Sequence, residues 1–421
     1  MVTELLSIID MAQKEEIYVG LDIGTSKIAC VVAKRESEDH LSIIGVGTSR
    51  ATGLKKGVVS EIEETVSGIS EAVEVAERMA GIDISSVSVN INGSTLGSLN
   101  STGVVAVGRA DQQIIDEDVN RAEDASQAIQ ISPNKEILHT FPRIFKVDDQ
   151  EGIKDPVGMS GIRLEVETHI VTVGVQPSKN LKRVMNQAGV IIDDEIATPL
   201  ASAKAVLKKR QKNLGCAVVD IGASTTGIAV FEDGEIFHTS VLPIGGMHIT
   251  NDIAIGLRTS IDIAEKVKIK YGHAHKKGVS EKATIDLSEI DIKEEGTVTQ
   301  RHVAEIVEAR VEEILKMVRE KLKSIEREAL LPAGVILTGG VAKLPGLDDK
   351  AKEVLKLPSE VGKPQNLFGM TEKVYDPAFS TAVGLLLYNF EELGASRGNR
   401  ITPGKGGITP IVKRIIKTFL P

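Results

Sequence analysis

The strongest constraint on the fold of this chain is a short motif that occurs twice. Residues 19–27 read VGLDIGTSK and residues 218–226 read VVDIGASTT, so Asp-Ile-Gly-x-Ser begins at Asp22 and again at Asp220. Each copy follows one apolar run and precedes another. Strand, polar turn and strand is the pattern of a β-hairpin. Its repetition in the two halves of the chain predicts a duplicated α/β architecture with two turns at one cleft.

Two such turns would present backbone amides, hydroxyl groups and two carboxylates to a common ligand. Amides in a glycine turn converge on anions, and Asp22 and Asp220 suit a magnesium ion that keeps much of its water shell. We therefore expect a polyphosphate with Mg²⁺, and Lys27 is placed to reach its terminal phosphates. Two ordinary hairpins remain the alternative, because a single motif of this kind is common in turns.

Composition limits the classes of protein to which the chain can belong. With 421 residues it should form more than one domain. A net charge of −9, an aromatic content of 3% and no Trp disfavour nucleic acid as a partner. Cys30 and Cys216 lie in apolar segments and are expected to be reduced core residues. No segment approaches the ~20 apolar residues of a membrane span, and no signal peptide is visible, so we expect a cytoplasmic or peripheral membrane protein.

The pattern of apolar runs and polar loops predicts an order of domains along the chain. The basic run 208–212 is expected to be a solvated helix end. The predicted parts are an N-terminal extension (1–16), a first domain (17–83 and 166–214), an inserted subdomain (84–165), a second domain (215–393) with a helical part at about 255–335, a glycine-rich linker (394–407) and a terminal helix (408–421).

The C-terminal segment has the pattern of an amphipathic helix. From residue 394 to the end there are six basic residues and no acidic one. An apolar face opposite a basic face is typical of a helix that lies on anionic lipid. The alternative is a helix that docks on the body of the protein. The predicted membrane-contacting residues are Ile411, Val412, Lys413, Arg414, Ile415, Ile416, Lys417, Phe419 and Leu420.

Two glycine pairs and one charged pair are weaker candidates for ligand contact. Gly245-Gly246 and Gly339-Gly340 each follow an apolar strand, where glycine lets backbone approach a ligand closely. Glu265 and Lys268 share one face of a predicted helix. By spacing alone, the glycine pairs are ordinary loops and the charged pair is a surface ion pair.

Taken in this order, the motifs resemble the actin-like nucleotide-binding superfamily. The inserted subdomain, the stretch QEGIKDPVGMSG at 150–161, LTGG at 337–340, the small-residue helix at 380–387 and the basic tail further resemble the FtsA family of bacterial cell-division proteins. The resemblance covers the chain from Ile17 to Pro421. It implies an actin-like, ribonuclease H-like duplicated two-domain fold with an FtsA-type inserted subdomain.

The resemblance also implies roles for particular residues. The first phosphate turn would be Gly24, Thr25, Ser26 and Lys27, and the second Gly222, Ala223, Ser224 and Thr225. Gly339 and Gly340 would approach the nucleotide, ATP or ADP, from the second domain, and Glu265 and Lys268 would hold its ribose and adenine. Gly245 and Gly246 stay candidates by their position after a strand. Thr198 stands where related filament proteins have a carboxylate that orients the hydrolytic water, so hydrolysis is expected to be slow because threonine is a poor base.

Partners and location follow from the same resemblance. It implies a filament of this chain at the cytoplasmic face of the membrane at the division septum, bound to anionic lipids and to other division proteins. It also implies binding of the FtsZ C-terminal tail by the helical part of the second domain, with Arg301 and Arg310 as candidate contacts. A sugar or acid kinase of the same superfamily is the first alternative, and a chaperone-type ATPase the second.

Overall fold

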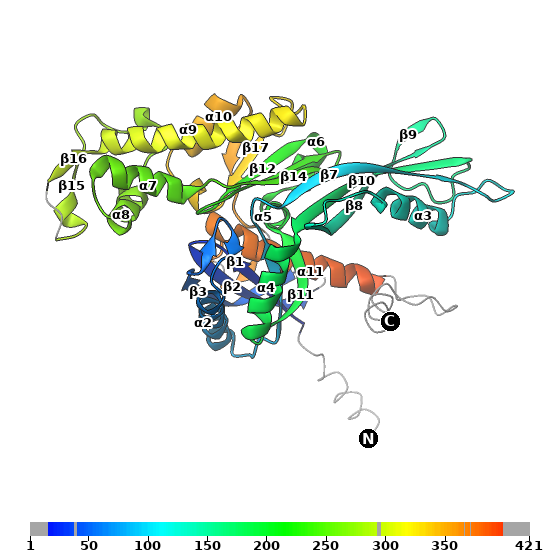
Figure 1. Cartoon of the computed structure of the whole chain (residues 1–421), viewed down its shortest axis with the longest axis horizontal. Coiled ribbons are helices and arrows are strands. Elements are labelled where there is room, and N and C mark those ends of the chain that lie inside the picture. Colours follow the sequence, from blue (N-terminus) through cyan, green and yellow to red (C-terminus); the bar gives the residue numbers. More distant parts are fainter. Residues whose placement is uncertain (1–15, 38–39, 293–295, 366, 371, 399–421) are drawn as a thin grey trace, which may run out of the picture.

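The computed structural model describes residues 16–37, 40–292, 296–365, 367–370 and 372–398 (Figure 1). Two mixed sheets form the two halves of the molecule, and helices α5 (Thr198–Val206) and α11 (Ser380–Gly398) pack against each other between them. α11 contacts β1, β2 and β6 of the first sheet, and α5 contacts β12, β13 and β17 of the second. Among the described helices, none combines the length and apolarity needed to cross a bilayer.

The two sheets share one topology, which confirms the duplication. Each has three antiparallel strands in succession. The first of them also pairs in parallel with a later strand, and that strand pairs in parallel with one more. The first sheet contains β1 (Ile17–Ile23), β2 (Lys27–Ser37), β3 (His40–Arg50), β6 (Ser86–Ile91), β11 (Ile191–Ala197) and the short β19 (Phe368–Gly369). The second contains β12 (Cys216–Ile221), β13 (Thr226–Glu232), β14 (Glu235–Leu242), β17 (Val335–Thr338) and β18 (Ser359–Val361).

Amphipathic helices cover the outer faces of these sheets. α2 (Ile62–Ala80) buries Ile69, Ala72 and Ala76 against the first sheet and ends at Gly81, whose φ of 71° is favourable for glycine. The first half also carries α4 (Val175–Gln187), and the second carries α6 (Lys209–Leu214), α7 (Gly246–Leu257), α8 (Ile261–Tyr271), α9 (Gln300–Ser324) and α10 (Leu347–Leu355).

Short elements complete the described chain. They are the strand pairs β4 (Leu54–Lys55) with β5 (Val58–Val59) and β15 (Thr284–Asp286) with β16 (Thr297–Thr299), and the 3₁₀ turns η1 (Lys276–Gly278), η2 (Leu287–Glu289), η3 (Gly340–Lys343) and η4 (Pro377–Phe379).

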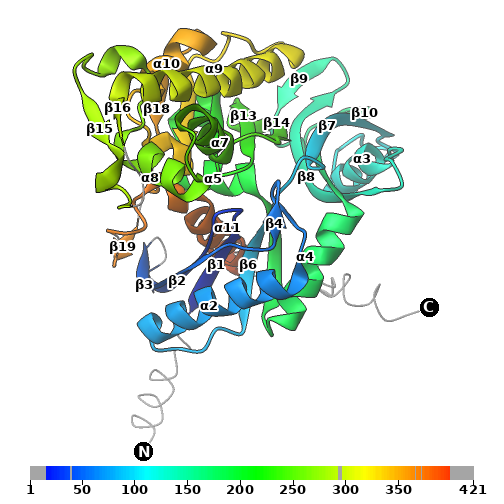
Figure 2. The ribbon, with the colours of Figure 1, turned by 60° about the vertical axis from the view of Figure 1, so that its left-hand side comes forward.

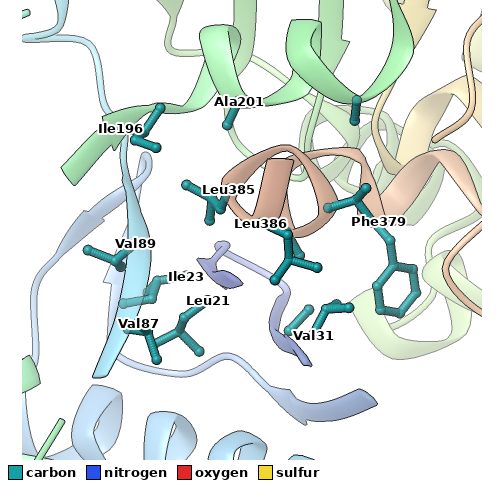
Figure 3. Close-up of a cluster of buried hydrophobic side chains, with 14 of the residues drawn as sticks. Leu21, Ile23, Val31, Val87, Val89, Ile196, Ala201, Phe379, Leu385 and Leu386 are labelled. Carbon is teal, nitrogen blue, oxygen red and sulfur yellow. The ribbon is translucent and has the colours of Figure 1, made fainter. Parts of the chain in front are cut away.

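The core of the first half includes the C-terminal helix. Figure 3 shows Leu385 and Leu386 of α11 beside Leu21, Ile23 and Val31 of the β1–β2 hairpin, with Val87 and Val89 of β6 next to them. β19 pairs with β3 in the same sheet. The chain therefore returns to the first half before its end, which corrects the predicted extent of the second domain, 215–393. The sequence predicts a helix at 380–387, but its pattern does not tell which of the two cores this helix fills.

α11 is longer than the helix expected from the sequence. It continues to Gly398, so the first residues of the predicted linker 394–407 are helical. The remaining linker residues and the predicted membrane helix 408–421 lie outside the described residues, as does most of the predicted extension 1–16.

The inserted subdomain has its own sheet and its own small core. β7 (Gly97–Ala106), β8 (Lys135–Val147), β9 (Gln150–Ile153) and β10 (Arg163–Gly174) form the sheet, and α3 (Asp116–Gln127) packs on it. The predicted boundaries 84–165 need correction at both ends. β6 pairs in parallel with β1 inside the first sheet, and β10 continues to residue 174. Residues 87–91 of β6 are all buried, as expected for a strand inside the sheet.

The inserted subdomain is connected through the chain to the first half but packs against β14 of the second half (Figures 1 and 2). The Ser98 hydroxyl accepts the Thr239 N–H at 3.0 Å and donates to the Thr239 carbonyl at 2.8 Å, so it caps the backbone of this edge strand. The buried His169 ring lies between Asn100 Oδ1 at 2.7 Å and Thr239 Oγ1 at 3.2 Å.

We predict that the buried histidines at this contact make the protein less stable in mild acid. Burial and the neighbouring His238 and Arg143 lower the pKa of His169 to about 3, and burial with nearby Lys321 lowers that of His238 to about 4. Both rings are neutral in the folded protein and gain a proton on unfolding below the unfolded pKa near 6.5. The free energy of unfolding therefore falls as the pH drops below about 6.5. The loss is roughly 2 kcal/mol per ring between pH 7.5 and pH 5.

Urea unfolding at the two pH values measures this effect. The variant His169→Gln should reduce the difference in the free energy of unfolding between pH 7.5 and pH 5 by roughly 2 kcal/mol. His302→Gln, at an exposed position on α9, is the matched control and should leave the difference unchanged. An equal pH dependence in all three proteins would contradict the prediction.

Candidate nucleotide cleft

The repeated motif forms two equivalent four-residue turns that face each other. In the first, the Gly24 N–H donates to the Lys27 carbonyl at 3.1 Å, and in the second the Gly222 N–H donates to the Thr225 carbonyl at 2.9 Å. The two turns meet where the hydroxyls of Thr25 and Ser224 lie 2.7 Å apart. The expectation that the hairpins open on one cleft is therefore confirmed.

The cleft between the halves has a volume of ≈ 990 Å³, on the scale of a nucleotide-sized ligand. Of the residues expected at the ligand, those that line it are Asp22, Gly24, Thr25, Ser26, Lys27, Asp220, Gly222, Ala223, Thr225, Gly246, Glu265, Lys268, Gly339 and Gly340. Ser224 and Gly245 are the two expected residues that do not line it. A Cβ on Gly245 would lie 2.5 Å from the Gly222 carbonyl oxygen, so only glycine lets this backbone pack on the second turn.

The two carboxylates are held differently at the inner end of the cleft. Asp22 Oδ1 accepts a hydrogen bond of 2.9 Å from the Asn90 amide. Burial raises the pKa of Asp22 to about 7. The charge of Lys27 acts to lower this pKa and that of Asp220 acts to raise it. Asp220 accepts hydrogen bonds from the hydroxyls of Ser202 and Thr381, and burial raises its pKa as well. A cation between two such groups would offset their repulsion.

The donor set fits magnesium better than a metal that needs a full protein cage. The described residues contain no group of three or more His, Cys, Asp and Glu side chains arranged to hold a metal ion. Mg²⁺ binds oxygen ligands and takes one or two carboxylates together with water and substrate phosphates. Asp22 and Asp220 match that requirement.

Lys27 lies in the wall of the cleft, where η4 holds it. Its ammonium donates to the Ala378 carbonyl at 2.9 Å and lies 3.5 Å from the centre of the Phe379 ring. Burial lowers the pKa of Lys27, partly offset by the attraction of Asp22 and Asp376. This cation is therefore fixed beside the first turn, where a terminal phosphate could replace the carbonyl as its partner.

The glycine pair after β17 lets backbone reach the cleft. Gly339 has a φ of 86°, and a Cβ there would lie 2.3 Å from Asp220 Oδ1. Gly340 has open space in the direction of a side chain. Gly339 is thus required by its conformation and by its contact with Asp220, whereas Gly340 leaves room for a ligand.

The charged pair on α8 is more than a surface ion pair. Glu265 Oε2 accepts hydrogen bonds from Lys268 Nζ at 2.6 Å and from the Thr250 hydroxyl, and Lys268 Nζ also donates to the Gly246 carbonyl at 3.2 Å. The pair therefore links α8 to the start of α7 at the outer part of the cleft.

Sequence reasoning missed two sets of residues in this region. The apolar side chains of Ile261, Ile269 and Leu344 line the cleft, although single apolar residues in a sequence indicate core. The polar residues behind the carboxylates were missed too. Asn90 falls on one of the polar positions of the alternating segment SVSVNI at 86–91, so no local signal marked it. Its burial, and hence its need for partners, is visible only in the structure.

The structure does not bring Arg301 and Arg310 to this cleft. Both lie on α9 in the helical part of the second half. Arg310 forms a two-pronged ion pair with Asp252 of α7, at 2.6 Å and 2.9 Å, and Arg301 pairs with Glu281.

Two family models match the chain. Residues 217–384 match "Cell division protein FtsA", and residues 93–172 match "SHS2 domain inserted in FTSA", which coincides with the inserted subdomain. The FtsA protein of Pseudomonas aeruginosa is 41% identical over 380 residues, covering 90% of this chain and 91% of that protein. The FtsA protein of Bacillus subtilis is 42% identical over 373 residues, covering 89% and 83%.

Solved structures of lower identity share the fold. The PilM–PilN type IV pilus biogenesis complex matches with a TM-score of 0.62 at 17% identity, over 89% of this chain and 98% of that one. MreB5 of Spiroplasma citri bound to ADP matches with a TM-score of 0.54 at 14% identity, over 91% and 99%. The fold is therefore actin-like, and the chain belongs to the FtsA family of bacterial cell-division proteins.

Proposed function

We propose that this chain binds ATP with Mg²⁺ in the cleft, assembles into filaments on the inner membrane surface and tethers FtsZ filaments there, where it recruits later division proteins. The observation that carries the nucleotide part is the pair of opposed glycine turns around a cleft of ≈ 990 Å³. The MreB5 structures with ADP and with AMPPNP show that an actin-like relative holds such ligands.

In this proposal the backbone amides of the two turns bind the phosphates, and Lys27 supplies a fixed positive charge. Asp22 and Asp220 hold hydrated Mg²⁺, which would neutralise phosphate charge. Glu265 and Lys268 bind the ribose and base, while Gly246, Gly339 and Gly340 leave backbone exposed to the nucleotide.

ATP acts here as an assembly ligand more than as a substrate. Thr198, at the position where a carboxylate would orient water, donates its hydroxyl proton to the Ile91 carbonyl at 3.2 Å and accepts from Asn90 at 3.1 Å. A hydroxyl engaged in this way is a poor base. The alternative, a sugar or acid kinase, would transfer phosphate to an added acceptor, which a coupled phosphotransfer assay detects.

We predict that Gly340→Leu strongly weakens nucleotide binding without unfolding the protein. The new side chain enters open space in the cleft instead of striking backbone, so the fold tolerates it while ATP is blocked. Calorimetric titration with MgATP should show at least a tenfold loss of affinity, equal to about 1.4 kcal/mol.

Gly108→Leu is the matched control, because that glycine also has open space around it but lies in the inserted subdomain. Its affinity should equal that of the parent chain. If Gly340→Leu bound ATP as tightly as the parent, the cleft would not be the nucleotide site.

The membrane part of the proposal rests on the sequence of residues 408–421. Three basic residues near anionic headgroups contribute on the order of 1 kcal/mol each, so a single tail binds weakly. Many tails on one filament bind strongly through their high effective concentration. Assembly and membrane attachment therefore support each other.

We predict that a chain ending at Gly407 no longer sediments with anionic liposomes in the presence of MgATP. A second variant, Lys413→Glu with Lys417→Glu, keeps the apolar face but reverses two charges of the basic face. It should lose binding to anionic vesicles and should not bind neutral vesicles either. Sedimentation of the shortened chain equal to that of the full chain would rule out the tail as the anchor.

Binding of the FtsZ C-terminal tail is proposed for the helical part of the second half, around α9. Arg301 is the more accessible candidate, since its partner Glu281 is exposed and such pairs contribute little. Arg310 is engaged with Asp252, so a change there would also weaken the contact between α7 and α9.

We predict that Arg301→Glu lowers the affinity for an FtsZ tail peptide about tenfold, because a charge reversal at an interface opposes an acidic ligand. Fluorescence anisotropy with a labelled peptide measures this. Arg319→Glu, farther along the same helix, is the control and should keep the parent affinity. Equal affinities in all three chains would remove Arg301 from the binding surface.

A further inference from the structure

A buried asparagine lies directly behind the first carboxylate of the cleft. Asn90, near the end of β6, is 3% exposed. Its Oδ1 accepts the Ile23 N–H at 2.7 Å, and its Nδ2 donates to Asp22 Oδ1 at 2.9 Å and to Thr198 Oγ1 at 3.1 Å. Both amide protons and the carbonyl oxygen are thus used within one cluster.

These contacts fix which oxygen of Asp22 faces the turn. Asn90 holds Oδ1, while Oδ2 lies 4.0 Å from the point that a Cβ on Gly24 would occupy. The Ile23 N–H belongs to the residue between Asp22 and Gly24, so the same amide also holds the backbone from which the turn begins. The carboxylate and the turn are therefore set relative to each other by one side chain.

The second copy of the motif lacks this arrangement. Asp220 is held by the hydroxyls of Ser202 and Thr381, which lie 3.0 Å from each other and can rotate. A planar amide with two fixed donors constrains a carboxylate more tightly than two rotatable hydroxyls do. The duplication is thus asymmetric where a hydrated cation would approach, and the first carboxylate has the more rigid support.

We propose that Asn90 is a positioning residue that aims Asp22 at the hydrated magnesium ion of the bound nucleotide. The proposal rests on the proposed nucleotide function of the cleft. Asn90 itself touches neither nucleotide nor metal. Partners that orient a metal-binding carboxylate typically change metal affinity 10–100-fold when they are removed. The part of the ATP affinity that depends on Mg²⁺ should therefore depend on Asn90, and the affinity for metal-free ATP should not.

The test uses the full chain and compares ATP binding with excess Mg²⁺ and with EDTA by calorimetry. For Asn90→Leu, which removes the amide at similar size, the ratio of the two affinities should fall at least tenfold relative to the parent chain. The affinity in EDTA should stay within about threefold, which is less than 1 kcal/mol. A purely structural role would lower both affinities together and leave their ratio unchanged, which would overturn the proposal.

Two further variants keep the test decisive. Asn90→Asp retains an acceptor for the Ile23 N–H but replaces both donors with a negative charge, so it should reduce the ratio even if Asn90→Leu fails to fold. Asn389→Leu is the matched control, because it removes another buried amide that donates to Ser88 on the same strand at 3.0 Å. Its ratio should equal that of the parent chain.

The outcomes separate this proposal from the one on which it rests. If the parent chain bound no ATP, the nucleotide function itself would fail. If it bound ATP with the same affinity with and without Mg²⁺, the proposed magnesium site of Asp22 and Asp220 would fail together with the role of Asn90. If ATP binding depended on Mg²⁺ but Asn90→Asp kept the parent ratio, only the role of Asn90 would fail.

Discussion

The packing of α11 on α5 is the contact on which the geometry of the cleft depends. A Cβ on Gly384 would lie 1.7 Å from the Ala201 carbonyl oxygen, so these helices approach at backbone distance. Because the pair fills the space between the two sheets (Figure 2), it sets how far apart the hairpins of the two halves lie. Thr381 of α11 and Ser202 of α5 also bind Asp220. The same two helices therefore space the sheets and support one carboxylate.

Much of the fold and of the cleft could be predicted because the decisive signals are local. A strand, a glycine turn and a strand define each hairpin within about ten residues, so Asp22, Asp220 and the turn glycines were located correctly around one cleft. Their roles toward a ligand stay predictions. The FtsA family and the actin-like fold were predicted from the order of the motifs and are confirmed.

What could not be predicted depends on contacts between distant parts of the chain. β6 was assigned to the start of the inserted subdomain, because the residues around this strand do not show that it pairs with β1. A helix was predicted at 380–387, but only the tertiary structure assigns α11 to the first half. Likewise, the ion pair of Arg310 with Asp252 joins residues 58 positions apart in the chain, and an exposed arginine and an engaged one look the same in a sequence.

The inserted subdomain is attached to both halves of the molecule. Its chain enters and leaves through the first half, yet Ser98 and His169 bind β14, and Lys154 donates to the Asp233 carbonyl just before that strand. β14 leads within a few residues to Gly245 and Gly246, whose backbone packs on the second turn. β14 thus connects the second turn to the inserted subdomain, which does not itself line the cleft.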